Sequence, residues 1–112
     1  MPGPASIPKG NISLNMVLSV ALTPASVSNA TSAEQTFTVN GLQVGDFVDV
    51  VQPTTQANLV IGNVRVTAAN TLGINFGNVG AATITPTAGE IYAVNVTRYE
   101  NAALGSAPSA IL

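Results

Sequence analysis

The sequence predicts an all-β protein, an antiparallel β-sandwich or barrel of jelly-roll type, and three observations lead to this prediction. Hydrophobic residues alternate with polar ones in several short segments, which is the pattern of strands with one buried face. Gly, Pro and Asn separate these segments at turn positions. No segment has convincing helical periodicity, and no internal repeat of fixed period is present. Roughly six or seven short strands of this kind are typical of a sandwich or a barrel.

The 112 residues are predicted to form one folded domain with two extensions. Residues 1–11 are rich in proline, which favours extended backbone, so they are expected to form an arm. Residues 12–99 hold all the predicted strands of the β-sandwich domain. Residues 100–112 are expected to form a tail of small residues.

The first strand is predicted over residues 12–22, where period-two alternation continues for the whole segment and Thr23-Pro24 ends it. Residues 25–33 are small and are expected to hold at most a short strand. A second clear strand is predicted at 35–39, and Asn40-Gly41 supplies a turn that tolerates positive φ.

Two further strands are predicted in the middle of the chain. One covers residues 47–51, and Pro53 shortly after it prevents the strand from continuing. The other covers residues 58–66. Within the second strand we expect Arg65 to point outward and Gly62 to mark a β-bulge.

The last part of the domain is predicted to contain a hairpin, a loop and a final strand. Ala69-Asn70 is expected to turn the chain into a strand over residues 72–76. Residues 78–89 form a loop that we expect Ile84 and Pro86 to anchor. The final strand is predicted at 91–99.

The chain is unusually poor in charge. Charged residues make up 7% of it, compared with about 25% in ordinary soluble domains. The basic residues are Lys9, Arg65 and Arg98, which are too few to neutralise a phosphate backbone or an anionic membrane surface. We therefore expect no nucleic-acid or membrane partner. Since a free monomer keeps itself soluble with mixed surface charge, the neutral composition favours a subunit that packs against neighbours.

The composition also argues against catalysis. The chain contains no histidine and no cysteine, so the commonest general base, thiolate nucleophiles and the usual zinc ligands are missing. The remaining chemical candidates are Asp46, Asp49 and Glu90 as a hard-cation site, and Asp46 and Asp49 as a catalytic acid pair. Their spacing does not match the EF-hand pattern. We expect instead that Asp46 is a turn residue and that Asp49 pairs with Arg65 or Arg98, and we predict no catalytic residue, metal or cofactor.

Two tyrosines, Tyr92 and Tyr99, are too few and too far apart in sequence to form a stacking platform for bases or sugars. Tyr92 alternates with core residues. It is therefore expected to be buried with its hydroxyl group hydrogen-bonded.

An ordered set of segments resembles small virion structural proteins of tailed bacteriophages. The set covers roughly residues 30–99 and consists of EQTFTV (34–39), VGDFV (44–48), NVRVTAANTL (63–72), INF (74–76) and ATITPTAGE (82–90). The resemblance implies a β-sandwich subunit that decorates the outer surface of the capsid as a dimer or trimer. It also implies the major capsid protein as partner, assembly in the host cytoplasm and no catalytic residues.

The two extensions are the predicted contacts to the capsid or to other subunits. Ordered on a partner, an extended arm and a small-residue tail would gain backbone hydrogen bonds and bury their few apolar side chains. The alternative is that both are mobile tails. The residues predicted to make these contacts are Pro2, Pro4, Ile7, Pro8, Lys9, Ile111 and Leu112.

The sequence therefore predicts a non-enzymatic decoration or cement subunit on the capsid exterior, which oligomerises through a charge-poor face. One alternative is a head-fibre, tail or host-surface adhesion module of a virion. The other is an enzyme or lysis accessory protein, which the absence of His and Cys disfavours.

Overall fold

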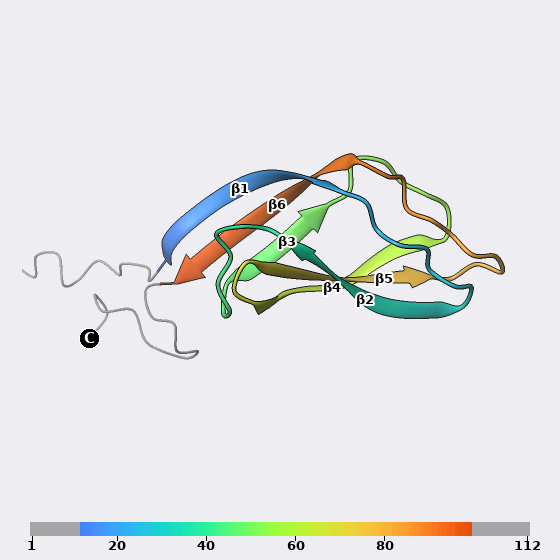
Figure 1. The fold of residues 1–112 in the computed structure, drawn as a ribbon, viewed down its shortest axis with the longest axis horizontal. Coiled ribbons are helices and arrows are strands. Elements are labelled where there is room, and N and C mark those ends of the chain that lie inside the picture. The colour runs from blue at the N-terminus through green and yellow to red at the C-terminus, as the bar shows by residue number, and fades with distance from the viewer. Residues whose placement is uncertain (1–11, 100–112) are drawn as a thin grey trace, which may run out of the picture.

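The computed structural model describes residues 12–99, and in this range the chain is all-β. Its strands form two antiparallel three-stranded sheets (Figure 1). None of the described residues forms a helix that could cross a membrane. The strands are β1 (Ile12–Leu22), β2 (Thr31–Thr38), β3 (Phe47–Val51), β4 (Leu59–Ala68), β5 (Thr71–Asn78) and β6 (Glu90–Tyr99).

The chain passes repeatedly from one sheet to the other. One sheet has the order β1-β6-β3 and the other the order β2-β5-β4. β4 and β5 are consecutive in the chain and also neighbours in one sheet, and Ala69 and Asn70 join them as a hairpin (Figure 1). Asn70 has a φ of 59°, a conformation that Asn adopts more readily than most residues, so the predicted hairpin turn is confirmed.

The inner faces of the two sheets share one hydrophobic core in a sandwich-like arrangement. The central strands β5 and β6 supply its middle, because each has a neighbour on both edges and the opposite sheet above it. Their inward side chains are fully buried: Leu72, Ile74 and Phe76 on β5, and Tyr92, Val94 and Val96 on β6. The alternation that predicted these strands is the alternation that builds the core.

The predicted strand positions are confirmed, with differences at the ends. β1 and β3 have the predicted bounds, but β2 begins at Thr31 rather than at residue 35. The earlier residues join the strand because Thr31 to Ala33 find partners at Asn78 to Phe76 of β5. The predicted bulge near Gly62 is also confirmed, since the β4–β5 register shifts between Ile61 and Val64.

The loop between β5 and β6 is anchored as predicted. Ile84 and Val27 exchange two backbone hydrogen bonds, at N–O distances of 2.7 and 3.0 Å. Pro86 is buried as well. Val27 lies in the small-residue segment 25–33, where at most a short strand was expected. Outside β2, that segment forms this isolated antiparallel bridge to Ile84.

Candidate functional site

The outer face of the β1-β6-β3 sheet is neutral and partly apolar, and we call it the neutral face. Its cross-strand rows are Asn15–Thr97–Phe47, Val17–Asn95–Asp49 and Ser19–Ala93–Val51, followed by the pair Ala21–Ile91. Asp49 is the charged member of these rows. Such a face has almost no charge with which to repel or orient a partner.

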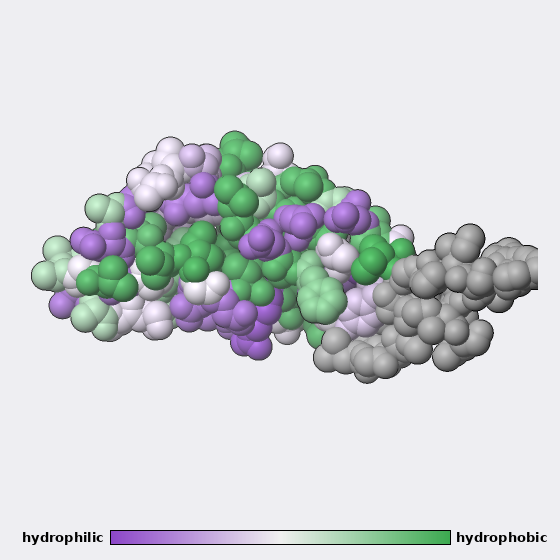
Figure 2. All heavy atoms as spheres, turned by 180° about the vertical axis from the view of Figure 1, so that it is seen from behind, coloured by the Kyte–Doolittle hydropathy of each residue, from purple (hydrophilic) through white to green (hydrophobic). Residues whose placement is uncertain are grey.

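Several large hydrophobic side chains on the neutral face are exposed to solvent. The exposed fraction is 66% for Val17, 61% for Phe47, 60% for Val51 and 55% for Ile91. In a space-filling view the hydrophobic residues form a broad band along the molecule, broken by polar groups (Figure 2). Isolated exposed hydrophobic residues are common, but several on one sheet face without charge are typical of a surface that a partner covers.

An aromatic pair lies at one end of the neutral face. The rings of Phe47 and Tyr99 have centroids 5.6 Å apart and planes inclined at 43°. This pair could not be predicted from the sequence, since the two residues are far apart in the chain and β3 and β6 bring them together. The segment Phe47–Val51 did carry a related signal, because hydrophobic residues occupy positions on both of its faces.

The outer face of the β2-β5-β4 sheet is different, because it is polar and carries an ion pair. Glu34 on β2 and Arg65 on β4 are joined by two hydrogen bonds of 2.8 Å across the central strand. The pair crosses Gly73, where a Cβ atom would lie 2.8 Å from a Glu34 carboxylate oxygen. Glycine at this position therefore leaves room for the ion pair, and the hydrogen bonds from Arg65 lower the pKa of Glu34.

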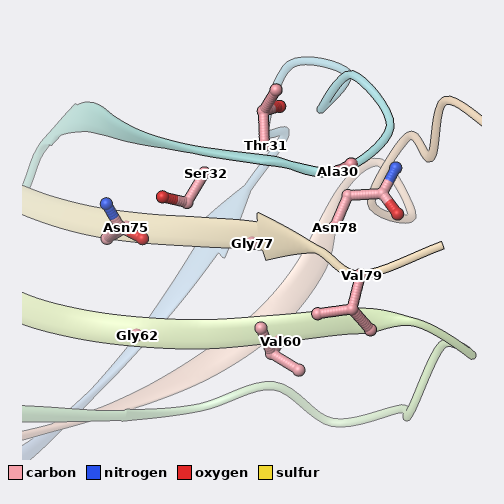
Figure 3. A pocket seen from close by; sticks show the side chains of 9 residues that line it. All are labelled: Ala30, Thr31, Ser32, Val60, Gly62, Asn75, Gly77, Asn78 and Val79. Atoms are coloured by element: carbon pink, nitrogen blue, oxygen red, sulfur yellow. The ribbon is translucent and has the colours of Figure 1, made fainter.

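A shallow furrow of about 410 Å³ runs along the same polar face (Figure 3). Gly77 lies beneath it, and a Cβ atom there would come within 2.8 Å of Val60. The lining residues are Ala30, Thr31, Ser32, Val60, Gly62, Asn75, Gly77, Asn78 and Val79. Since none of them is aromatic or ionisable, the furrow has no group for acid–base chemistry or for stacking against a sugar.

The residues considered as a cation site or acid pair do not come together. Asp46 pairs with Arg98 near the end of β6, whereas Glu90 begins that strand, and the Cα atoms of Arg98 and Glu90 are about 26 Å apart along it. The described residues contain no group of His, Cys, Asp and Glu side chains able to hold a metal ion.

Asp46 is a turn residue, as predicted, and also one half of a structural ion pair. Its amide donates to the carbonyl of Gln43, and its carboxylate accepts from Arg98 Nε at 2.8 Å and Arg98 Nη2 at 2.9 Å. Arg98 also donates to the carbonyl of Gly41, so it ties β6 to the loop between β2 and β3. The hydrogen bonds from Arg98 hold the pKa of Asp46 below its ordinary value.

The prediction that Asp49 pairs with Arg65 or Arg98 is wrong. Both arginines in the described range are paired with other carboxylates, Arg65 with Glu34 and Arg98 with Asp46. The Asp49 carboxylate accepts from the backbone N–H of Val50 at 2.9 Å. The reason is the sheet arrangement, which places Asp49 opposite Asn95 rather than beside an arginine.

Tyr92 is fully buried, as predicted, but its hydroxyl has no hydrogen-bond partner among residues 12–99. The expectation of a bonded hydroxyl is therefore wrong. Tyr92 belongs to the hydrophobic core that the two sheets share. Burial raises the pKa of Tyr92, and the charge of Glu90 adds to the effect.

A buried amide that sequence reasoning missed holds the loop after β5. Asn78 Nδ2 donates to the carbonyls of Val27 at 3.0 Å and Ala82 at 2.7 Å. Its Oδ1 accepts from the amide of Gly80 at 2.9 Å. Nothing in the local sequence separates this Asn from an ordinary loop residue, because its contacts with Gly80 and Ala82 lie within the loop and only the contact with Val27 joins it to a distant segment.

The terminal contacts that the sequence predicts lie outside the described residues. Pro2, Pro4, Ile7, Pro8 and Lys9 precede residue 12. Ile111 and Leu112 follow residue 99. Their roles stay predictions.

Comparisons with protein-family models, with curated proteins and with solved structures found no match to this chain.

Proposed function

We propose that this chain is a non-catalytic structural subunit of a virion, which decorates the outer surface of a tailed-bacteriophage capsid. The observation that carries the proposal is the neutral face. Exposed Val17, Phe47, Val51 and Ile91 would be a liability on a free protein but suit a surface that an assembly covers. The resemblance of residues 30–99 to phage virion proteins supplies the identity of the assembly.

The partner in this proposal is the major capsid protein, which the neutral face contacts. A subunit that binds only the expanded, assembled lattice stabilises that lattice by mass action. Many copies bind one particle, so a modest affinity at each site is sufficient. A nearly uncharged contact, with Asp49 as its charged residue, would also depend little on salt concentration.

The fold suits this role. Two antiparallel three-stranded sheets form a small body that exposes a whole sheet face to a partner. The closer assignment to a jelly roll or a barrel stays a prediction. The described range holds six strands, and a complete jelly roll has eight.

A second candidate is a head-fibre, tail or host-surface adhesion module. The observation that favours it is the Phe47–Tyr99 pair, with Asp49 two residues further along β3 on the same face. Aromatic rings beside a carboxylate could contact a cell-surface sugar. This candidate predicts binding to a glycan array and few copies on each virion.

The deciding experiment is a binding assay on phage particles that lack the protein. Purified wild-type chain should bind the capsid exterior in many copies and restore resistance to heat and osmotic shock. Val51→Lys places a charge in the neutral face and should abolish both effects. Val60→Lys is the matched control, because it adds the same charge to an exposed valine on the opposite sheet and should bind normally.

Cryo-electron microscopy of the complete particles separates the two candidates. Many copies on the shell support decoration, and a few copies on a tail or fibre support the adhesion module. Particles that resist heat and osmotic shock equally well without the protein would contradict the cementing role.

A further inference from the structure

β1 is an unusual edge strand. It has 11 residues, and its partner in the sheet order is β6, so the other edge of β1 carries no strand among residues 12–99. Each of the other edge strands contains a charged residue: Glu34 in β2, Asp49 in β3 and Arg65 in β4. β1, with the sequence ISLNMVLSVAL, contains neither a charge nor a proline. Charges, prolines and β-bulges are the usual means by which proteins prevent an edge from pairing. β1 lacks the first two, and its one register shift lies at its N-terminal end, between Ile12 and Leu14.

The inward side chains of β1 are also incompletely covered. Leu14, Met16, Leu18 and Val20 are only half-buried, although they lie beside residues of β6 such as Val94 and Val96 that are fully buried. The core of the sandwich is therefore closed at its centre and less well covered along its edge strands. Phe37, Val48 and Ile61 on the other edge strands are partly buried in the same way, so the absence of charge is what distinguishes β1. A strand added to this edge would cover the open side of the row.

The sequence of β1 is complementary to itself. In an antiparallel pair, residues directly opposite each other point to the same face. If two copies of β1 pair about a two-fold axis at Val17, Met16 lies opposite Leu18 and Leu14 lies opposite Val20. The outward positions then match Asn15 with Ser19, so apolar meets apolar and polar meets polar.

We propose that β1 pairs antiparallel with β1 of a second copy of this chain. The result is a continuous sheet of order β3-β6-β1-β1-β6-β3, with the two cores on the same side. A second copy fits better than an unrelated partner for two reasons. The uncharged strand does not repel itself at the axis, and the same half-buried row on each copy covers the other. This inference does not depend on the capsid proposal, because the pairing is made by the backbone edge and the half-buried row of β1, although the side chain of Val17 itself lies on the neutral face.

Cross-linking tests the pairing directly, because the chain has no cysteine of its own. Val17→Cys places one thiol at the proposed axis, about 5 Å from its copy between Cα atoms. A short bismaleimide should then convert most of the full-length protein into a covalent dimer. Thr36→Cys, on the exposed face of the other sheet, is the control and should stay largely uncross-linked.

Charge at the axis tests the energetics. Val17→Lys places two lysines opposite each other and should weaken the dimer by more than about tenfold in Kd, measured by analytical ultracentrifugation. Val60→Lys should leave the Kd unchanged. Since Val17 is 66% exposed, the variant should fold with an unchanged circular dichroism spectrum.

Two results would overturn the inference. One is a wild-type chain that stays monomeric at the highest measurable concentration, with protection from hydrogen exchange at the β1 amides that point away from β6, since that would show the edge covered by another segment of the same chain. The other is a dimer that Val17→Lys leaves intact and that Val17→Cys does not cross-link. Neither result would affect the capsid-binding test, where Val51 and not Val17 is changed.

Discussion

The two sheets of this protein have similar inner faces and different outer faces. Both inner faces bury a row of apolar side chains, and each central strand is hydrogen-bonded to a strand along both of its edges. The outer face of β2-β5-β4 carries Thr, Asn and Gly residues and the Glu34–Arg65 ion pair. The outer face of β1-β6-β3 carries exposed Val17, Phe47, Val51 and Ile91 instead. On the strands of the polar sheet, Val60 is the exposed large hydrophobic residue. Since that sheet exposes so little apolar surface on its outer side, we attribute the larger set on the neutral face to binding.

The edge strands of the two sheets also differ in charge, and again the β2-β5-β4 sheet is the more polar one. Both edge strands of the polar sheet, β2 and β4, contain a charge, and β4 is also bulged. The other sheet has β1, which is long and uncharged. One sheet is therefore protected against further pairing, and the other is suited to contacts through its face and its edge.

The largest effect we expect comes from the polar sheet. Asn78→Ala removes three hydrogen bonds and leaves the carbonyls of Val27 and Ala82 without this donor, so unfolding should become easier by about 3 kcal/mol. Urea denaturation measures the change. The control is Asn75→Ala on the same strand, which faces outward and should change stability by less than about 0.5 kcal/mol. Equal effects would show that the Asn78 amide does not hold the loop.

How much of this could be predicted depends on whether the cause is local. The alternation in residues 12–22 and 47–51 is a local pattern, and it gave the correct strands and inward positions. The charge-poor composition likewise pointed to a neutral surface. The partner of Asp49 could not be predicted, because it depends on which strands become neighbours. The contact of Asn78 with Val27 could not be predicted either, because it joins segments that are far apart in the chain. The position of the neutral face required the sheet order as well.

The next effect concerns the other sheet and depends on pH. Asp46→Asn keeps the shape of the side chain but removes the charge that Arg98 contacts, so the melting temperature at pH 7 should fall by roughly 5–10 °C. The pKa of Asp46 is lowered in the folded state, so its contribution is complete above the ordinary aspartate pKa of about 4. This contribution is lost as the pH falls through the lower folded-state value.

Melting curves measured from pH 7 down to pH 2 test this linkage. The wild-type protein and Asp46→Asn should differ most near neutral pH and converge in acid. A difference that stays constant over the whole range would show that the ionised carboxylate contributes nothing specific.

A smaller effect, this time a gain in stability, is expected from a substitution on β6, the central strand of the β1-β6-β3 sheet. Tyr92→Phe removes a hydroxyl that is buried without a partner among the described residues, so stability should rise by about 1 kcal/mol. The ring keeps its packing, and no cavity forms. Thermal unfolding and urea denaturation should both show the gain. A loss of stability would mean that the hydroxyl is bonded in solution, for instance to a buried water molecule.

The smallest effect is expected on the exposed face of the polar sheet. Glu34→Gln breaks the ion pair with Arg65, but the arginine side chain is 59% exposed, so water can replace the lost contact. The melting temperature should change by no more than about 2 °C. Val51→Thr on the neutral face should have an equally small effect on the melting temperature, because Val51 is also exposed. The two variants should differ in capsid binding, where Val51→Thr weakens attachment and Glu34→Gln does not. If both variants bind equally well, the contrast between the two outer faces has no functional meaning, and the capsid contact must be made elsewhere in the chain.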